Sequence, residues 1–298
     1  MLTWLVLFGV ITLVFSLIHL VPGDPVQIML GEGAQARDVE QLRHNLGLDR
    51  SLVAQYAEYI HNLLLRADLG TSFRFGQPVA QIVIARYPAT LQLALLSLLA
   101  ALVIAIPAGV LASVYPGHWI DRTITSGTLI GISLPNFVSG PIAIIVFSIL
   151  LGWLPVSGRA GIQNYILPAT TLGVSLSAIL TRMIRAGMIE ELQEEYVKTA
   201  RAKGLPEWKV LLKHALKNSL IPVVTTIGLQ FGTLLAGAII TETIFSWPGI
   251  GRLTIQAINS RDYPLVQGCI LMIAVTYVAV NLLTDLAYGF LDPRIKYR

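Results

Sequence analysis

Charged side chains able to form ion pairs gather in one stretch of the chain, "EEYVKTARAKGLPEWKVLLKHALKNS", from Glu194 to Ser219. Together with the four residues before it, this stretch holds eleven charged residues, whereas charged residues make up only 13% of the whole chain. Acids and bases are mixed along it. Such a concentration of charge is unusual in so apolar a chain.

No catalytic or nucleotide-binding motif accompanies that charge. The chain has no G-x-x-x-x-G-K-[ST], so it has no P-loop of its own, and any ATP must be handled by a partner. It also lacks H-E-x-x-H, G-x-S-x-G and paired intramembrane aspartates. A single cysteine, Cys269, excludes an intrachain disulfide and a cysteine metal cluster. We therefore expect neither an enzyme nor a cofactor or metal site in this chain.

The composition is that of a membrane protein. Hydrophobic residues reach 54%, the mean hydropathy is +0.69, and the 13% of charged residues compares with about 25% in typical soluble domains. The net charge of +4 raises the alternative of nucleic-acid binding. However, the bases lie mostly between long apolar runs, which favours contact with a cytoplasmic membrane surface and no nucleic-acid partner.

Six runs are long and apolar enough to predict spanning helices, since a helix needs about 20 such residues to cross the hydrocarbon core. The first run lacks a basic n-region and a following A-x-A site, so we interpret it as a retained anchor and not as a signal peptide. The spans are predicted at Leu2–Leu20, Pro88–Val114, Thr123–Leu151, Tyr165–Ile184, Leu220–Ile240 and Leu265–Phe290.

Basic residues near the span ends predict the orientation. Eight bases lie between Arg182 and Lys217, and the tail "DPRIKYR" carries three, whereas the short loops on the opposite side carry few. The positive-inside rule then places both termini and the charged stretch in the cytoplasm.

The segment from Val21 to Tyr87 is consequently expected outside the cytoplasm. Ser51 is a candidate N-cap for a helix whose apolar residues repeat at helical spacing, and a short amphipathic helix is expected before Pro88, which suits the first turn of the second span. A cap over the bundle is one interpretation of this segment and direct substrate contact is the other. The apolar stripe comprises Leu52, Tyr56, Tyr59, Ile60 and Leu63.

Within the charged stretch the pattern predicts two helices joined by a hinge. Residues from Ile189 to Lys203 are strong helix formers, Gly204 is a natural C-cap, and Pro206 suits the first turn of a second helix. Ala200 and Gly204 are spaced as neighbours on one face, which predicts a small-residue ridge that another surface can approach closely. The alternative is a solvated face whose charges form ion pairs within the helix.

The run "EYVKTARAKGL" followed by "HALKNSLIPVVT" resembles the E-A-A loop of membrane subunits in ATP-binding cassette importers. In that family the loop is a coupling helix that docks in a groove of the ATPase subunit. Lys198, Thr199 and Ala200 occupy the E-A-A place and Gly204 the glycine. The docking residues that the resemblance implies are Glu194, Glu195, Tyr196, Lys198, Thr199, Ala200, Arg201, Ala202, Lys203 and Gly204.

Two departures point to one branch of the family. Lys and Thr replace the usual Glu and first Ala, and the distance from Gly204 to Pro222 is longer than in sugar transporters, as expected of the peptide and nickel branch. "HLVPGDP", "DLGTSF", "LGWLPVSG", "ETIFSWPGIGRL", "RDYP" and "DPRI" resemble the first of its two paralogous membrane subunits, in the right order along nearly the whole chain.

The resemblance implies an all-α integral membrane protein with six transmembrane helices, of the type I importer fold. The expected organisation has three parts. Residues 1–87 form the first span and the external segment, residues 88–290 form a five-helix core with the coupling loop at 188–218, and residues 291–298 form a cytoplasmic tail.

Polar residues inside the spans are the candidates for a translocation path. Ser133 and Asn136 flank Pro135 in the third span, where carbonyl groups are freed and a kink is possible. Thr226, Gln230 and Thr233 recur at helical spacing on the fifth span. Helix packing through small polar residues is the alternative interpretation of both groups.

The resemblance further implies an importer permease of a prokaryotic plasma (inner) membrane. Its expected partners are a paralogous permease subunit, two ATPases that bind ATP and Mg, an external substrate-binding protein and membrane lipid. Di- or oligopeptides are the first substrate class. Nickel or another small solute is the second, which the absence of a His or Cys cluster makes less favoured.

Alternatives from other classes are an ATP-independent carrier or channel and an intramembrane enzyme. The spans carry no Asp, Glu, Lys or Arg near their middle, which argues against proton coupling or voltage sensing. The enzyme would need a catalytic pair, which the spans do not offer.

Overall fold

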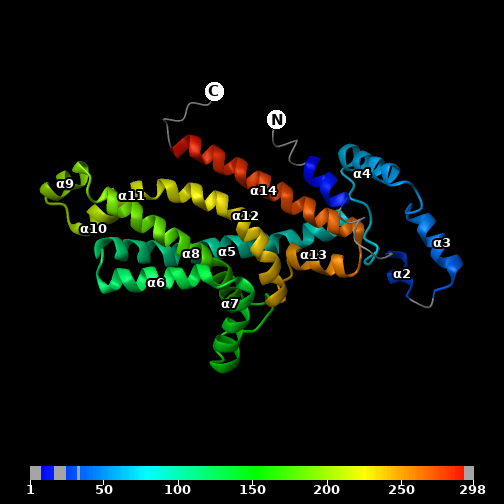
Figure 1. Ribbon diagram of the computed structural model, residues 1–298, viewed down its shortest axis with the longest axis horizontal. Helices are drawn as coiled ribbons and strands as arrows, with labels where there is room; N and C mark the ends of the chain where they lie inside the picture. Colours follow the sequence, from blue (N-terminus) through cyan, green and yellow to red (C-terminus); the bar gives the residue numbers. More distant parts are fainter. Residues whose placement is uncertain (1–7, 17–24, 32–33, 292–298) are drawn as a thin grey trace. The chain divides into compact units, whose positions relative to one another are not determined.

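The computed structural model describes residues 8–16, 25–31 and 34–291, and helices joined by turns make up this part of the chain (Figure 1). A lone β-bridge pairs Thr71 with Pro78. In chain order the elements are α2 Pro25–Leu30, α3 Ala36–Asn45, α4 Leu52–Arg66, α5 Val79–Val114, α6 Trp119–Ser133, α7 Asn136–Ala143, η1 Ile144–Leu150, α8 Gln163–Glu191, α9 Glu195–Ala202, α10 Glu207–Lys209, η2 Val210–Ala215, α11 Leu216–Ser219, α12 Ile221–Ile244, α13 Ile250–Asn259 and α14 Tyr263–Leu291.

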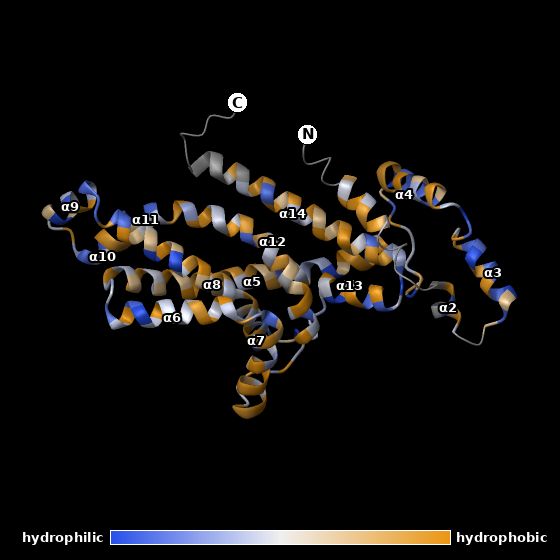
Figure 2. Ribbon diagram, viewed as in Figure 1, coloured by the Kyte–Doolittle hydropathy of each residue, from blue (hydrophilic) through white to orange (hydrophobic). Residues whose placement is uncertain are grey.

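Three helices of the described chain are each long and apolar enough to cross a membrane, namely α5, α8 and residues Tyr263–Thr284 of α14. Two bent pairs bring the number to five if each pair is one span, and these are α6 with Asn136–Leu150 and Glu207–Ser219 with Ile221–Ala236. Figure 2 shows α7 and η1 in hydrophobic colours, whereas α3 carries mostly hydrophilic ones. Of the first predicted span, residues 8–16 are helical and the remainder lies outside the described residues.

The third predicted span, Thr123–Leu151, is not one helix. It consists of α6 and the helical run Asn136–Leu150, which are bent by 106° with respect to each other. Leu134 between them has an extended backbone, with φ −91° and ψ 109°. The residue before a proline is pushed out of the helical region, and Pro135 has no N–H to continue the ladder, so the sequence "SLPN" breaks the helix instead of kinking it.

Pro88 lies inside a helix and not at the start of one. The helix α5 runs unbroken from Val79 to Val114, so the expected short amphipathic helix is its first part. Its 36 residues correspond to about 54 Å at 1.5 Å per residue. Because the hydrocarbon core is about 30 Å thick, α5 is longer than a span requires.

The described chain forms two compact units. Unit 1 comprises Met1–Thr90 and Pro248–Val278, and unit 2 comprises Leu91–Trp247 and Ala279–Arg298. Segments distant in sequence therefore fold together in unit 1. Its core joins residues of α5, α13 and α14 with Val14, and the buried members are Val14, Val79, Val83, Ile250, Leu253, Ala257, Leu265, Val266 and Cys269.

The predicted helix of the external segment is α4, and its predicted cap is confirmed. The Ala54 amide donates to the Ser51 hydroxyl oxygen at 3.3 Å. Tyr56 and Tyr59 face Phe15, with ring centroids 5.1 and 6.1 Å away. Burial raises the pKa of Tyr59 to about 12. Leu52, the first residue of the predicted stripe, is exposed.

In unit 2, glycines let helices cross closely. A Cβ atom at Gly173 of α8 would lie 2.6 Å from the Ser97 carbonyl oxygen of α5, and one at Gly109 of α5 would lie 2.7 Å from the Ile184 side chain. Contacts under 3 Å require the neighbour to move. The close α5–α8 contact therefore depends on glycine at positions 173 and 109, because a larger residue would collide with the other helix. Small residues play the same part in other membrane helix pairs.

Candidate functional site

The charged stretch folds as a helical hairpin between α8 and α12 (Figure 1). α8 ends at Glu191, a short turn follows, and α9 runs from Glu195 to Ala202. After the turn at "KGLP", the chain returns through α10, η2 and α11. The predicted pair of helices and their hinge are confirmed, although the first helix begins later than the composition indicated. We call residues 192–219 the loop hairpin.

Gly204 is in the left-handed region, with φ +75°, as a helix C-cap glycine commonly is. No atom lies within 4 Å of where its Cβ would stand. A side chain at this position would strain the backbone and project into open space.

A small apolar core joins the two arms of the loop hairpin. Val197 and Val210 are fully buried and Ala200 is 6% exposed, with Leu192 and Leu205 packed against them. The predicted small-residue ridge is thus wrong at Ala200, because the chain's own second arm already covers that side chain. Of Ala200 and Gly204, only Gly204 offers the expected open surface.

The remaining predicted docking residues are exposed, and some of their charges are paired. Lys198 donates to Glu195 at 2.7 Å, as expected within one turn. Arg201 instead reaches across the hinge to Glu207, also at 2.7 Å. This hydrogen bond holds the pKa of Glu207 below its usual range and raises that of Arg201. The exposed predicted residues are Glu194, Glu195, Tyr196, Lys198, Thr199, Arg201, Ala202, Lys203 and Gly204.

Tyr196 ties α9 to the elements on both sides. Its hydroxyl donates to the Glu191 carboxylate at the end of α8 and accepts from the Asn218 amide of α11 at 3.0 Å. Burial and then the hydrogen bond to Glu191 raise the pKa of Tyr196 to about 12. The contacts of Tyr196 with Glu191 and Asn218 were not predicted, because they form across a turn and across the hairpin and not at a helical spacing.

The second arm adds an apolar part to the exposed face of the loop hairpin. Trp208 is 61% exposed and Leu212 is 50% exposed, and the Lys209 ammonium lies 5.4 Å from the centre of the Trp208 ring. These residues were not among those predicted from the sequence. Exposed aromatic side chains beside charged ones are typical of protein contact surfaces, and an aromatic residue after the hinge was the available signal.

The predicted path residues fall in two places. Ser133 ends α6 and Asn136 begins α7, so both lie at the 106° bend. Thr226, Gln230 and Thr233 all lie on α12, where Thr226 donates to the Pro222 carbonyl and Thr233 to the Gln230 carbonyl. Hydroxyls that bond to their own helix fit both a path and the packing alternative. Their role in translocation stays a prediction.

A cavity of about 630 Å³ lies in unit 1, and none of the predicted path residues lines it. Its walls are formed by Phe15, by residues between His44 and Phe73 such as Arg50 and Tyr59, and by residues at the start of α14 such as Gln267. Whether the external segment is a cap or contacts substrate stays a prediction. In the described part of the chain no group of three or more His, Cys, Asp or Glu side chains is placed to hold a metal ion.

Two protein-family models together match nearly the whole chain. Residues 105–297 match the binding-protein-dependent transport system inner membrane component, and residues 1–94 match the N-terminal part of the membrane component of such systems. The chain belongs to this family. It is a multi-pass inner-membrane protein of a prokaryote, and its predicted all-α permease fold is confirmed.

Curated relatives are similar in sequence to this chain along nearly its full length. It is 43% identical over 292 residues to the glutathione transport system permease protein GsiC of Escherichia coli O6:H1, covering 98% of this chain and 95% of the relative. The protein of the same name from Shigella dysenteriae serotype 1 is 42% identical over the same length. The chain is therefore the permease subunit of an ATP-binding cassette importer, as the E-A-A resemblance indicated.

Solved structures support the same fold. An inward-facing structure of the MetNI methionine ABC transporter aligns with a TM-score of 0.58 at 18% identity, covering 71% of this chain and 97% of that chain. A crystal structure of an amino acid ABC transporter with histidines aligns with a TM-score of 0.53 at 17% identity, and the alignment covers 72% of this chain and 95% of that chain.

Proposed function

We propose that this permease forms the translocation path for di- or oligopeptides and couples it to partner ATPases through the loop hairpin. The observation that carries the substrate class is the 43% identity over 98% of the chain to a permease named for glutathione transport. Glutathione is itself a short peptide. Nickel or another small solute is the second candidate, because the peptide and nickel branch resembles this chain in the same motifs.

The proposed assembly contains this chain, a paralogous permease subunit, two ATPases and an external substrate-binding protein. ATP and Mg bind to the ATPases, so hydrolysis takes place outside this chain. Closure of the ATPase dimer would move the docked hairpin, and the spans would change between inward-open and outward-open states. The exposed charges and Trp208 support the hairpin as the docking surface.

The decisive variant for docking is Gly204→Arg. The open space at this position accepts the side chain, at a backbone cost of about 1 kcal/mol. We expect normal amounts of folded permease, loss of ATPase co-purification and loss of uptake in proteoliposomes. A variant that transports like the wild type would show that the surface around Gly204 is not docked.

A matched control is Gly152→Arg, since Gly152 also has a positive φ, +64°, and open space around its Cβ position. It lies on the loop after η1, which the charge pattern places on the opposite side of the membrane. This variant should keep its ATPases. The substrate class is tested separately, by identifying the co-expressed external binding protein and measuring whether peptides or Ni²⁺ bind to it.

A further inference from the structure

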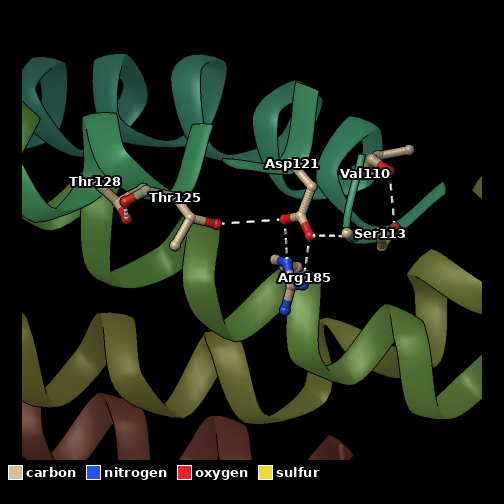
Figure 3. Close-up of polar contacts among 7 residues, drawn as sticks. Val110, Ser113, Asp121, Thr125, Thr128 and Arg185 are labelled. Carbon is tan, nitrogen blue, oxygen red and sulfur yellow. Dashed lines mark hydrogen bonds and ion pairs between the residues drawn. The ribbon is translucent and has the colours of Figure 1, made fainter. Parts of the chain in front are cut away.

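An ion pair between a buried carboxylate and a partly exposed guanidinium joins α6 to α8 (Figure 3). The Arg185 guanidinium donates twice to the Asp121 carboxylate, from Nε at 2.5 Å and from a terminal nitrogen at 2.7 Å. The Gly117 amide donates to the same carboxylate at 2.8 Å, and the Thr125 hydroxyl at 3.3 Å. The Asp121 side chain is only 6% exposed and that of Arg185 is 31% exposed.

This arrangement fixes the geometry of the two helices at one point. A bidentate guanidinium–carboxylate pair allows little rotation, because both hydrogen bonds must stay in one plane. Removing Arg185 would leave the buried Asp121 carboxylate without a compensating charge, which proteins strongly disfavour. α6 and α8 therefore stay in register at this end as long as the pair is intact.

A second contact holds the same helices further along. The Ser175 hydroxyl of α8 donates to the Gly131 carbonyl of α6 at 3.3 Å. A Cβ atom at Gly131 would lie 3.3 Å from the Ala178 side chain, so the backbones are close here. Gly131 lies two residues before Ser133, at the bend between α6 and α7. The two helices are thus joined both at Asp121 and beside the bend.

The loop hairpin is attached to the same helix, α8. Gly187 lies two residues after Arg185, and a Cβ atom there would lie 3.1 Å from the Ser219 side chain of α11. At the end of α8, Glu191 accepts the hydrogen bond of Tyr196. A displacement of the hairpin would therefore be passed to α8 close to Arg185.

We infer that the Asp121–Arg185 pair makes α6 and α8 one rigid lever that carries hairpin movement to the bend at Ser133 and Asn136. This inference rests on the proposed coupling function of the hairpin. Asp121 and Arg185 are positioning residues in this scheme, because their hydrogen bonds to each other hold one helix against the other. Thr125, which donates to Asp121, supports the same end of the lever.

The test uses the full complex, with its partner subunits and loaded binding protein, in proteoliposomes. Uptake and ATP hydrolysis are measured together for Asp121→Asn, Arg185→Gln and the double variant. We expect each single variant to keep ATP hydrolysis while the uptake per ATP falls at least about fivefold, the lower range of measured allosteric couplings. The double variant should be no worse than the worse single one, because the two residues act through one contact.

Two further variants serve as comparisons. Thr123→Ala on α6 removes an exposed hydroxyl that donates to the Trp119 carbonyl of the same helix at 2.9 Å, and it should change neither uptake nor ATP hydrolysis. Arg185→Lys keeps the charge but loses the bidentate geometry, so it should assemble and fall between the wild type and Arg185→Gln. An unchanged ratio of uptake to hydrolysis in the assembled variants would overturn the lever. A wild-type complex without ATP-driven uptake would instead refute the proposed function.

Spin labels provide a second measurement that does not depend on activity. Labels introduced by Ser126→Cys on α6 and Ala186→Cys on α8 occupy exposed positions, and Cys269 is buried. The distance between them should be the same with and without ATP in the wild-type background, and its distribution should broaden in Asp121→Asn. A nucleotide-dependent change of this distance in the wild-type background would contradict a rigid lever.

Discussion

At the residue scale, Asp262 shows how one buried carboxylate organises a turn of unit 1. Its side chain has no exposure and accepts hydrogen bonds from the Ser72 hydroxyl and from the amides of Phe73 and Arg74, both at 3.1 Å. The Leu265 amide donates to it at 3.3 Å. The motifs "DLGTSF" and "RDYP", which looked separate in the sequence, thus meet at this carboxylate.

Replacing this carboxylate should release the turn. In Asp262→Ala the donors of residues 72–74 lose their acceptor. The Ser72 hydroxyl is buried, and a buried donor left unpaired costs about 1–3 kcal/mol. We expect faster trypsin cleavage after Arg74, which is exposed, with the spans still folded. Asp68→Ala is the control, because Asp68 is exposed and accepts only the Gly70 amide, at 2.8 Å. Equal cleavage of both variants would contradict this role.

At the element scale, the loop hairpin is a small folded unit because its two arms bury side chains against each other. Neither α9, with 8 residues, nor α10, with 3, is long enough to be a stable helix alone. The Val197–Val210 contact and the Arg201–Glu207 pair supply the missing support. A docking surface of defined shape depends on these contacts within the hairpin.

Val210→Ala should loosen the hairpin without affecting the spans. Loss of buried methyl groups costs about 1.5 kcal/mol at roughly 0.8 kcal/mol per CH₂. We expect amide exchange in α9 to become faster while exchange in α8 upstream of Gly187 stays as in the wild type, measured by mass spectrometry. Leu212→Ala is the matched control, since Leu212 is half exposed in the same arm. Unchanged exchange in α9 would show that the core is dispensable.

At the scale of the whole molecule, charge and hydropathy predict on which side each loop lies. The loop hairpin carries most of the bases between Arg182 and Lys217, whereas α4 belongs to a segment longer than 60 residues that crosses largely regardless of its charge. The two should therefore lie on opposite sides of the membrane.

Membrane-impermeant maleimide tests this orientation. Ala202→Cys in the hairpin and Leu65→Cys in α4 are both at exposed positions. Leu65→Cys should react in intact spheroplasts, and Ala202→Cys, in the permease expressed without its ATPases, only in inside-out vesicles. The wild type is the control, because its one cysteine is buried. Labelling of both variants from the same side would refute the orientation.

Local signals in the sequence were enough for the membrane class, the helical composition, the cap at Ser51 and the hinge at Gly204. Each of these depends on residues close together in the chain, such as an apolar run, an N-cap or a C-cap glycine. The E-A-A resemblance, also a local motif, indicated the importer family that the comparisons confirm. For the same reason the bend at Pro135 was foreseen as a kink, but not its 106° angle.

Only the tertiary structure decided which distant residues meet. Ala200 is adjacent to Gly204 on a helix by spacing, but the return of Val210 buries it. Asp121 and Arg185 are 64 positions apart, and nothing in either local sequence pairs them. Their contact depends on how α6 packs on α8, which side-chain shape and burial determine over the whole unit. The sequence by itself therefore determined what the permease is, and packing decided how its loop hairpin is supported.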